Sequence, residues 1–172
     1  DNALFTVDDR IFRIGSKAHN GDLAAFCQHE YVKFLVAVLL LSGDPGRDDL
    51  VYISVNPANG FAAPSKEFKL ETENGFIQYN DTIPSTWIFD YQKIETVRIA
   101  RPDKSPAITM NCGQFPLLAV WANPEGTFIC LEPWFGRSDN DGFTGTIDEK
   151  EAAQKLAAGE TKKISHTVEF HK

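Results

Sequence analysis

The chain has 172 residues, of which 42% are hydrophobic and 24% charged, and its formal net charge is −7 at neutral pH. This length and composition are typical of one globular domain with a sizeable core, and they exclude a disordered chain. The acidic balance argues against a phosphate-backbone partner, so we expect no nucleic acid to bind.

The first half of the chain carries patterns of β-strands. Two short alternating segments, Leu4–Val7 and Ile11–Ile14, predict either a hairpin or two frayed strands. A central strand is expected over Tyr31–Leu41, and its longest apolar run, Phe34–Leu41, is far shorter than the roughly 20 residues of a membrane helix. We therefore expect no membrane partner. Another strand is expected over Leu50–Val55.

The second half continues with short strands separated by turn signals about every eight to twelve residues, a pattern typical of an all-β sandwich or barrel. These strands are expected over Phe68–Glu71, Gly75–Tyr79, Trp87–Phe89, Thr96–Ala100, Ala107–Cys112, Leu117–Trp121, Phe128–Glu132 and Thr161–Phe170. The turn sequence Asn123-Pro124-Glu125-Gly126 predicts that the two strands on either side of it pair as a hairpin. One helix is expected, over Glu149–Leu156. With no repeat or linker in the sequence, residues 1–172 are expected to form a single domain.

The stretch from Phe128 to Gly136 carries the candidate chemistry. An alternating strand runs into Glu132, Pro133 and Trp134. Because proline cannot donate to a β-ladder, the strand must end or lie on a sheet edge there. Glu132 is thus expected to be a carboxylate at a strand end, and Trp134 offers a flat face on which a sugar ring can stack. The alternative is a surface glutamate beside a core tryptophan.

The same region resembles the C-terminal end of the aldose 1-epimerase (galactose mutarotase) family, in particular its bacterial LacX-like subgroup. The resemblance lies in Cys-Leu-Glu-Pro-Trp-Phe-Gly-Arg-Ser-Asp at 130–139, Gly-Phe-Thr-Gly at 142–145, Leu-Ala-Ala-Gly-Glu at 156–160 and the preceding strand at 114–121. It extends over about residues 87–170. It implies an antiparallel β-sandwich of the galactose mutarotase-like supersandwich type, shortened on its N-terminal side.

The resemblance implies that the chain interconverts the α and β anomers of a hexose by acid–base ring opening, with Glu132 as the base. The family's acid is a histidine in a His-Pro-Ala-Phe segment, and Asn56 stands in its place here. An amide cannot supply a proton near neutral pH. His29 faintly resembles the family's second histidine, while Arg137 and Asp139 are candidates for binding sugar hydroxyls.

Cofactor and metal sites are not expected. The three cysteines, at 27, 112 and 130, lack the spacing of a zinc site or a disulfide framework, so buried thiols in a reducing, cytoplasmic compartment are expected. No secretory leader is expected. Because the first residue is Asp1 and not Met, we expect the chain to start inside a longer gene product. Unpaired edges of a shortened sandwich would favour a homodimer.

Two alternatives to an enzyme follow from the missing acid. The chain could be a non-catalytic carbohydrate-binding sandwich that keeps the pocket, or a purely structural sandwich that has no site. The structural alternative predicts that Glu132 points into bulk solvent with no pocket around it.

Overall fold

The computed structural model describes residues 3–7, 10–14, 49–72, 75–77, 86–122 and 129–172. Within these residues the protein is all-β, with three antiparallel sheets and a single turn of 3₁₀ helix, η1 (Ile147–Glu149). The strands are β1 (Ala3–Val7), β2 (Arg10–Ile14), β3 (Val51–Val55), β4 (Ala62–Lys69), β5 (Thr86–Asp90), β6 (Thr96–Ala100), β7 (Pro106–Asn111), β8 (Leu117–Ala122), β9 (Ile129–Trp134) and β10 (Thr167–Phe170).

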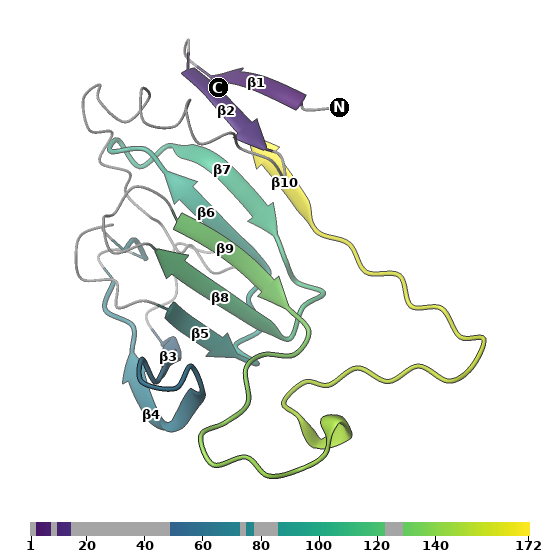
Figure 1. Cartoon of the computed structure of the whole chain (residues 1–172). Coiled ribbons are helices and arrows are strands. Elements are labelled where there is room, and N and C mark those ends of the chain that lie inside the picture. Colours follow the sequence, from purple (N-terminus) through teal and green to yellow (C-terminus); the bar gives the residue numbers. More distant parts are fainter. Residues whose placement is uncertain (1–2, 8–9, 15–48, 73–74, 78–85, 123–128) are drawn as a thin grey trace, which may run out of the picture.

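Two of the sheets make a β-sandwich (Figure 1). One has five strands in the order β4-β3-β5-β8-β9, and the other has three in the order β10-β7-β6. The main core joins them: Phe89 and Leu118 of the five-stranded sheet cluster with Val97 of the three-stranded sheet. Antiparallel strands with one apolar face are stable only when that face is covered. The expected all-β sandwich is therefore confirmed.

Both expected hairpins are present. β1 pairs with β2 and forms a two-stranded sheet of its own, so the hairpin alternative holds. β8 pairs with β9 along its whole length, from Leu117 opposite Trp134 to Ala122 opposite Ile129. The expected central strand over Tyr31–Leu41 lies outside the described residues.

The expected helix over Glu149–Leu156 is wrong. η1 ends at Glu149, the next residue, Lys150, has an extended backbone, and Ala152 has a φ of 52°, which a right-handed helix does not allow. The capping box between Thr146 and Glu149 provides hydrogen-bond partners for the backbone N–H groups at the start of η1. No residue of η1 is buried. Because so short a helix is stable only when its apolar face packs, the chain leaves the helical conformation after one turn.

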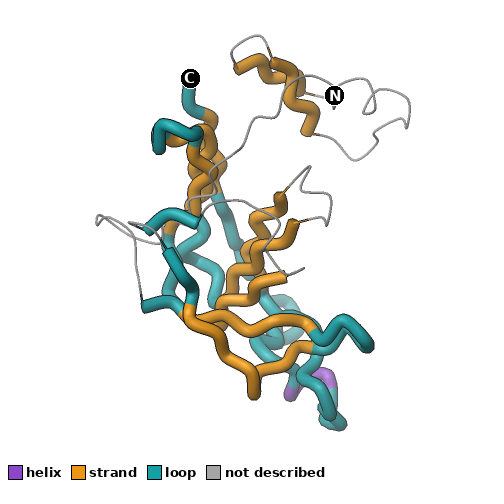
Figure 2. The backbone as a smooth tube through the Cα atoms, turned by 90° about the vertical axis from the view of Figure 1, so that its left-hand side faces the viewer, coloured by secondary structure: helices purple, strands orange, loops and turns teal. Residues whose placement is uncertain are grey.

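The expected closing strand is present but shorter, because it begins at Thr167 and not at Thr161. Its partner β7 ends at Asn111, which lies opposite Thr167, so β7 offers no further residues to pair with the chain before Thr167. Residues 151–166 instead form an extended segment from η1 back to β10, visible as the long yellow-green stretch in Figure 1. Figure 2 shows η1 and the β1–β2 hairpin at opposite ends of the molecule.

The strand with the Glu-Pro-Trp sequence also differs from expectation. β9 continues through Pro133 to Trp134, so Glu132 lies inside the strand and not at its end. β9 is the last strand of its sheet in the described part of the chain. An edge strand has one row of N–H groups without ladder partners, and a proline is tolerated there. Of the two expected alternatives, a strand end or a sheet edge at Pro133, the described residues show the edge.

Some expected elements are described in part. β4 includes residues 68 and 69 of the strand expected over residues 68–71, but it begins earlier, at Ala62, and ends at Lys69. Of the expected strand at 75–79, only 75–77 are described, and they belong to no named strand. Among the described residues, no helix is long and apolar enough to cross a membrane.

Candidate functional site

Glu132 lies on the outer face of the five-stranded sheet, the face turned away from the three-stranded sheet. Ile129 and Leu131 of β9 pack against the main core between the sheets. Because side chains alternate along a strand, Cys130, Glu132 and Trp134 lie on the opposite face. All three are partly buried. Glu132 is therefore partly covered by the residues around it.

Two tryptophans flank this carboxylate. Trp121 of β8 pairs with Cys130, and Trp134 follows Glu132 by two residues on the same face. Along the strand direction, the positions of Trp121 and Trp134 are thus each two residues from that of Glu132, about 7 Å, on opposite sides of it. The residue directly across from Glu132 is Ala119, whose small side chain is fully buried. A carboxylate and two aromatic residues on one face of a sheet are residue types that suit a neutral sugar.

Cys130 contacts the same carboxylate. Burial raises the pKa of its thiol, and the charge of Glu132 and a hydrogen bond to it raise the pKa further. The thiol therefore stays protonated at neutral pH and can donate to Glu132. Sequence reasoning treated Cys130 only as an apolar position, although its spacing of two residues from Glu132 already placed both on one face.

Glu132→Gln is expected to make Cys130 more reactive toward iodoacetamide at pH 8. The negative charge of Glu132 and its hydrogen bond with Cys130 both favour the protonated thiol over the thiolate. Because the substitution removes the charge and weakens the acceptor, the pKa of Cys130 falls and the fraction of reactive thiolate rises. Alkylation rates measured by peptide mass spectrometry would show this. Cys112 is the internal control, because burial raises its pKa to about 11 and it should react slowly in both proteins. An unchanged rate at Cys130 would contradict the contact.

Trp134 has a packing role as well as an exposed part. It packs against a small cluster on the outer face formed by Ile53, Ala62 and Ile88, which are buried. Its ring therefore rests with one side on the sheet. Trp87, by contrast, is buried in the main core and is not a candidate for stacking on a ligand.

Arg137 is already committed to protein partners. Its Nε and Nη2 donate to the carboxylate of Asp90 at 2.7–3.1 Å, and its Nη1 donates to Asn140 Oδ1 at 2.6 Å and to the Ser138 carbonyl at 3.1 Å. Only 1% of the Arg137 side chain is exposed. The guanidinium is thus placed to hold the chain that follows Trp134, and not to bind a sugar hydroxyl.

Asp139 and Asn56 lie where this following segment reaches β4. The Asp139 carbonyl accepts a hydrogen bond from Ala62 N at 2.8 Å, and its carboxylate pairs with Lys150 at 3.1 Å. Asn56 closes β3: its Oδ1 accepts from Ala58 N at 3.0 Å, and its Nδ2 faces Asp141 at 3.5 Å. The side-chain amide therefore stabilises a turn.

The structure does not bring Asn56 next to Glu132. β3 and β9 are separated by β5 and β8 in the sheet order, which places them about 14 Å apart at ordinary strand spacing. Asn56 also lies beyond the end of β3, whereas Glu132 aligns with Ile53 through Ala119 and Ile88. The residue in the place of the family's acid is thus remote from the candidate base.

The histidine expected near the site, His29, lies outside the described residues. Of the described histidines, His166 packs edge-on against Phe115, and His171 hydrogen-bonds Thr109 on β7 at 2.8 Å. Neither lies on the outer face beside Glu132. Within the described ranges, no group of three or more His, Cys, Asp and Glu side chains is placed to hold a metal ion.

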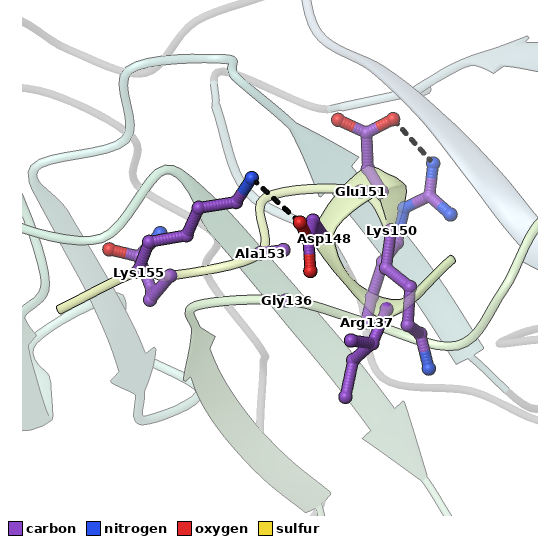
Figure 3. A pocket seen from close by; sticks show the side chains of 9 residues that line it. Gly136, Arg137, Asp148, Lys150, Glu151, Ala153 and Lys155 are labelled. Carbon is purple, nitrogen blue, oxygen red and sulfur yellow. Dashed lines mark ion pairs between the residues drawn. The ribbon is translucent and has the colours of Figure 1, made fainter. Parts of the chain in front are cut away.

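A pocket of about 460 Å³ lies away from Glu132, between the segment after β9 and the region of η1 (Figure 3). Its charged side chains are paired within the protein. Lys155 pairs with Asp148 at 3.3 Å, Arg137 lies 3.9 Å from Glu151, and Lys150 pairs with Asp139. These groups hold the pocket walls together, and the pocket contains none of the tryptophans.

Comparison of the chain with family models, with curated proteins and with solved structures finds no match.

Proposed function

We propose that this chain is an aldose 1-epimerase-like enzyme that interconverts the α and β anomers of a hexose on the outer face of its five-stranded sheet. The observation that carries the proposal is the partly buried carboxylate of Glu132 between Trp121 and Trp134. The resemblance of residues 130–139 to the family's Glu-Pro-Trp segment supports the same assignment. The reaction needs neither a metal nor a cofactor.

Glu132 is the base in this proposal. Its carboxylate takes the proton from the anomeric hydroxyl as the bond between C1 and the ring oxygen breaks and the C1 carbonyl forms. An acid protonates the ring oxygen. Rotation about the C1–C2 bond and the reverse proton transfers close the ring with the other configuration. Positioned acid–base groups of this kind contribute about 10²–10⁴-fold to a rate.

His29 is the candidate acid from the sequence. The thiol of Cys130 is too weak an acid for the role, because burial and Glu132 raise its pKa above the ordinary value. Substituting His29 by glutamine would test the assignment through the loss of turnover.

Polarimetry on freshly dissolved α-D-galactose and α-D-glucose tests the activity. The wild-type chain is expected to bring the optical rotation to its equilibrium value faster than buffer does, in proportion to protein concentration. Equilibration at the buffer rate for both sugars would refute the enzyme for these substrates.

A second candidate function is carbohydrate binding without turnover. The observation that favours it is the position of Asn56, which replaces the family's acid in sequence and is held in a turn remote from Glu132. Saturation-transfer NMR with D-galactose separates the two functions, because binding would persist while polarimetry shows no acceleration. Loss of binding in Trp134→Ala would place the sugar on the outer face.

We also propose a homodimer in the cytoplasm. In the described part of the chain, β4 and β9 end the five-stranded sheet, and β6 and β10 end the three-stranded one. β4 contains Pro64, Lys66 and Lys69, and β9 contains Pro133, residues that oppose edge-to-edge pairing, so the edges of the three-stranded sheet, β6 and β10, are the better candidates. Light scattering at working concentration is expected to give twice the mass of one chain, and a single monomeric species would contradict the dimer.

A further inference from the structure

The end of β9 is tied to β5 by a closed set of contacts. Asp90 pairs with Leu117, and Leu117 pairs with Trp134, so these three residues form one row across β5, β8 and β9. After Trp134 the chain turns, and Arg137 reaches back to the carboxylate of Asp90. The loop from Trp134 to Arg137 is therefore anchored at both ends to the same row of the sheet.

The turn itself depends on Gly136. Its φ is +86°, a conformation that a residue with a side chain rarely adopts. The glycine lets the chain reverse within two residues of Trp134, which brings Arg137 over the sheet and not out into solvent. Phe135, between them, packs against Phe115 with ring centroids 4.9 Å apart.

Arg137 and Asp90 form a geometrically demanding pair. The guanidinium donates in a fork to the Asp90 carboxylate, and the side chain of Asp90 is only 21% exposed. A planar fork on a carboxylate fixes orientation as well as distance. A lysine ammonium is a point charge and cannot reproduce it.

A second contact supports the pair from the η1 side. Glu151 lies 3.9 Å from Arg137 (Figure 3). It also accepts a hydrogen bond from the hydroxyl of Tyr91, the residue after Asp90, at 2.5 Å. This hydrogen bond to Glu151, with burial and the charges of Glu151 and Asp90, raises the pKa of Tyr91. The hydroxyl thus remains a donor at neutral pH.

We propose that Arg137 and Asp90 are positioning residues that hold Trp134 as the stacking platform for the sugar. The inference rests on the proposed function for its sugar, but the placement of Trp134 can be tested without one. Arg137 acts through Trp134. It fixes the turn after β9, and this turn determines which side of the Trp134 indole packs against the cluster of Ile53, Ala62 and Ile88. Neither Arg137 nor Asp90 touches the substrate.

Kinetics with Arg137→Lys test the role in sugar recognition. The variant keeps the positive charge and loses the fork, so the KM for galactose is expected to rise about tenfold while kcat changes less than about twofold, a free-energy change of roughly 1.4 kcal/mol. Lys155→Met is the matched control, because Lys155 lines the same pocket in an exposed pair and should leave KM unchanged. An unchanged KM in Arg137→Lys would overturn the inference.

Coupling to Trp134 separates positioning from a general loss of structure. In a Trp134→Ala background, Arg137→Lys is expected to cause little further rise in KM, because the platform is already absent. Independent effects that multiply would overturn the inference.

Fluorine NMR of protein labelled with 5-fluorotryptophan gives a readout that needs no sugar. Arg137→Lys and the milder Asp90→Asn are expected to shift or broaden the Trp134 resonance, assigned with Trp134→Phe, and to leave that of Trp87 unchanged. A change at Trp134 with no turnover or sugar binding in the wild type would keep the placement and refute the proposed function. An unchanged Trp134 resonance in both variants would refute the placement itself.

Discussion

Glu132→Gln is expected to lower the rate of anomer interconversion by about 10²–10⁴-fold, the contribution of a positioned proton-transfer group. Glutamine keeps the size and shape of the side chain, but its amide cannot accept the proton of the anomeric hydroxyl. Glu132 is partly buried on an edge strand, so the substitution should not disturb the main core. Polarimetry with α-D-galactose at equal protein concentrations measures the effect.

Glu67→Gln is the matched control for this variant. Glu67 is an exposed residue of β4 that pairs with Ile53, in the row that crosses the sheet to Glu132. The same change of charge on the same sheet should therefore leave the rate unchanged. Circular dichroism and thermal unfolding would confirm that both variants fold. A Glu132→Gln protein with wild-type turnover, or an equal loss in Glu67→Gln, would rule out Glu132 as the base.

Most of the strands could be predicted from the sequence because both sheets have one face in the main core. The alternation in Leu117–Trp121 and the turn sequence after it were enough to predict the β8–β9 hairpin. The helix expected near Glu149 is wrong because the apolar residues of this region do not pack against another part of the protein. Ile147 is 79% exposed and Leu156 is 57% exposed. Local pattern does not decide the structure of a segment whose apolar side chains remain in solvent.

The candidate site was only partly predictable. Glu132 and Trp134 are two residues apart in a strand, so their common face follows directly from the sequence. The pairing of Arg137 with Asp90 joins residues 47 positions apart, and it depends on the sheet order and on the turn at Gly136. For this reason sequence reasoning assigned Arg137 to the sugar and overlooked Asp90.

Phe89→Ala is expected to lower the free energy of unfolding by about 3–5 kcal/mol, the usual cost of removing a fully buried aromatic ring. Phe89 is 0% exposed and belongs to the main core with Val97 of the opposite sheet. Its ring also meets Tyr52 edge-on, with centroids 6.3 Å apart. The loss follows from the apolar surface no longer buried and from the cavity left between two sheets that cannot close fully over it.

Equilibrium unfolding in urea measures this change, and Phe61→Ala is its control. Phe61 is 41% exposed, so its truncation should alter stability by no more than about 0.5 kcal/mol. Natural domains are stable by only about 5–15 kcal/mol, so the loss at Phe89 should shift the urea midpoint strongly. Equal, small effects of the two substitutions would mean that the five- and three-stranded sheets do not share the core around Phe89. A large effect at Phe89 alone is the result expected for a ring packed between the two sheets, one of which carries Glu132 and Trp134 on its outer face.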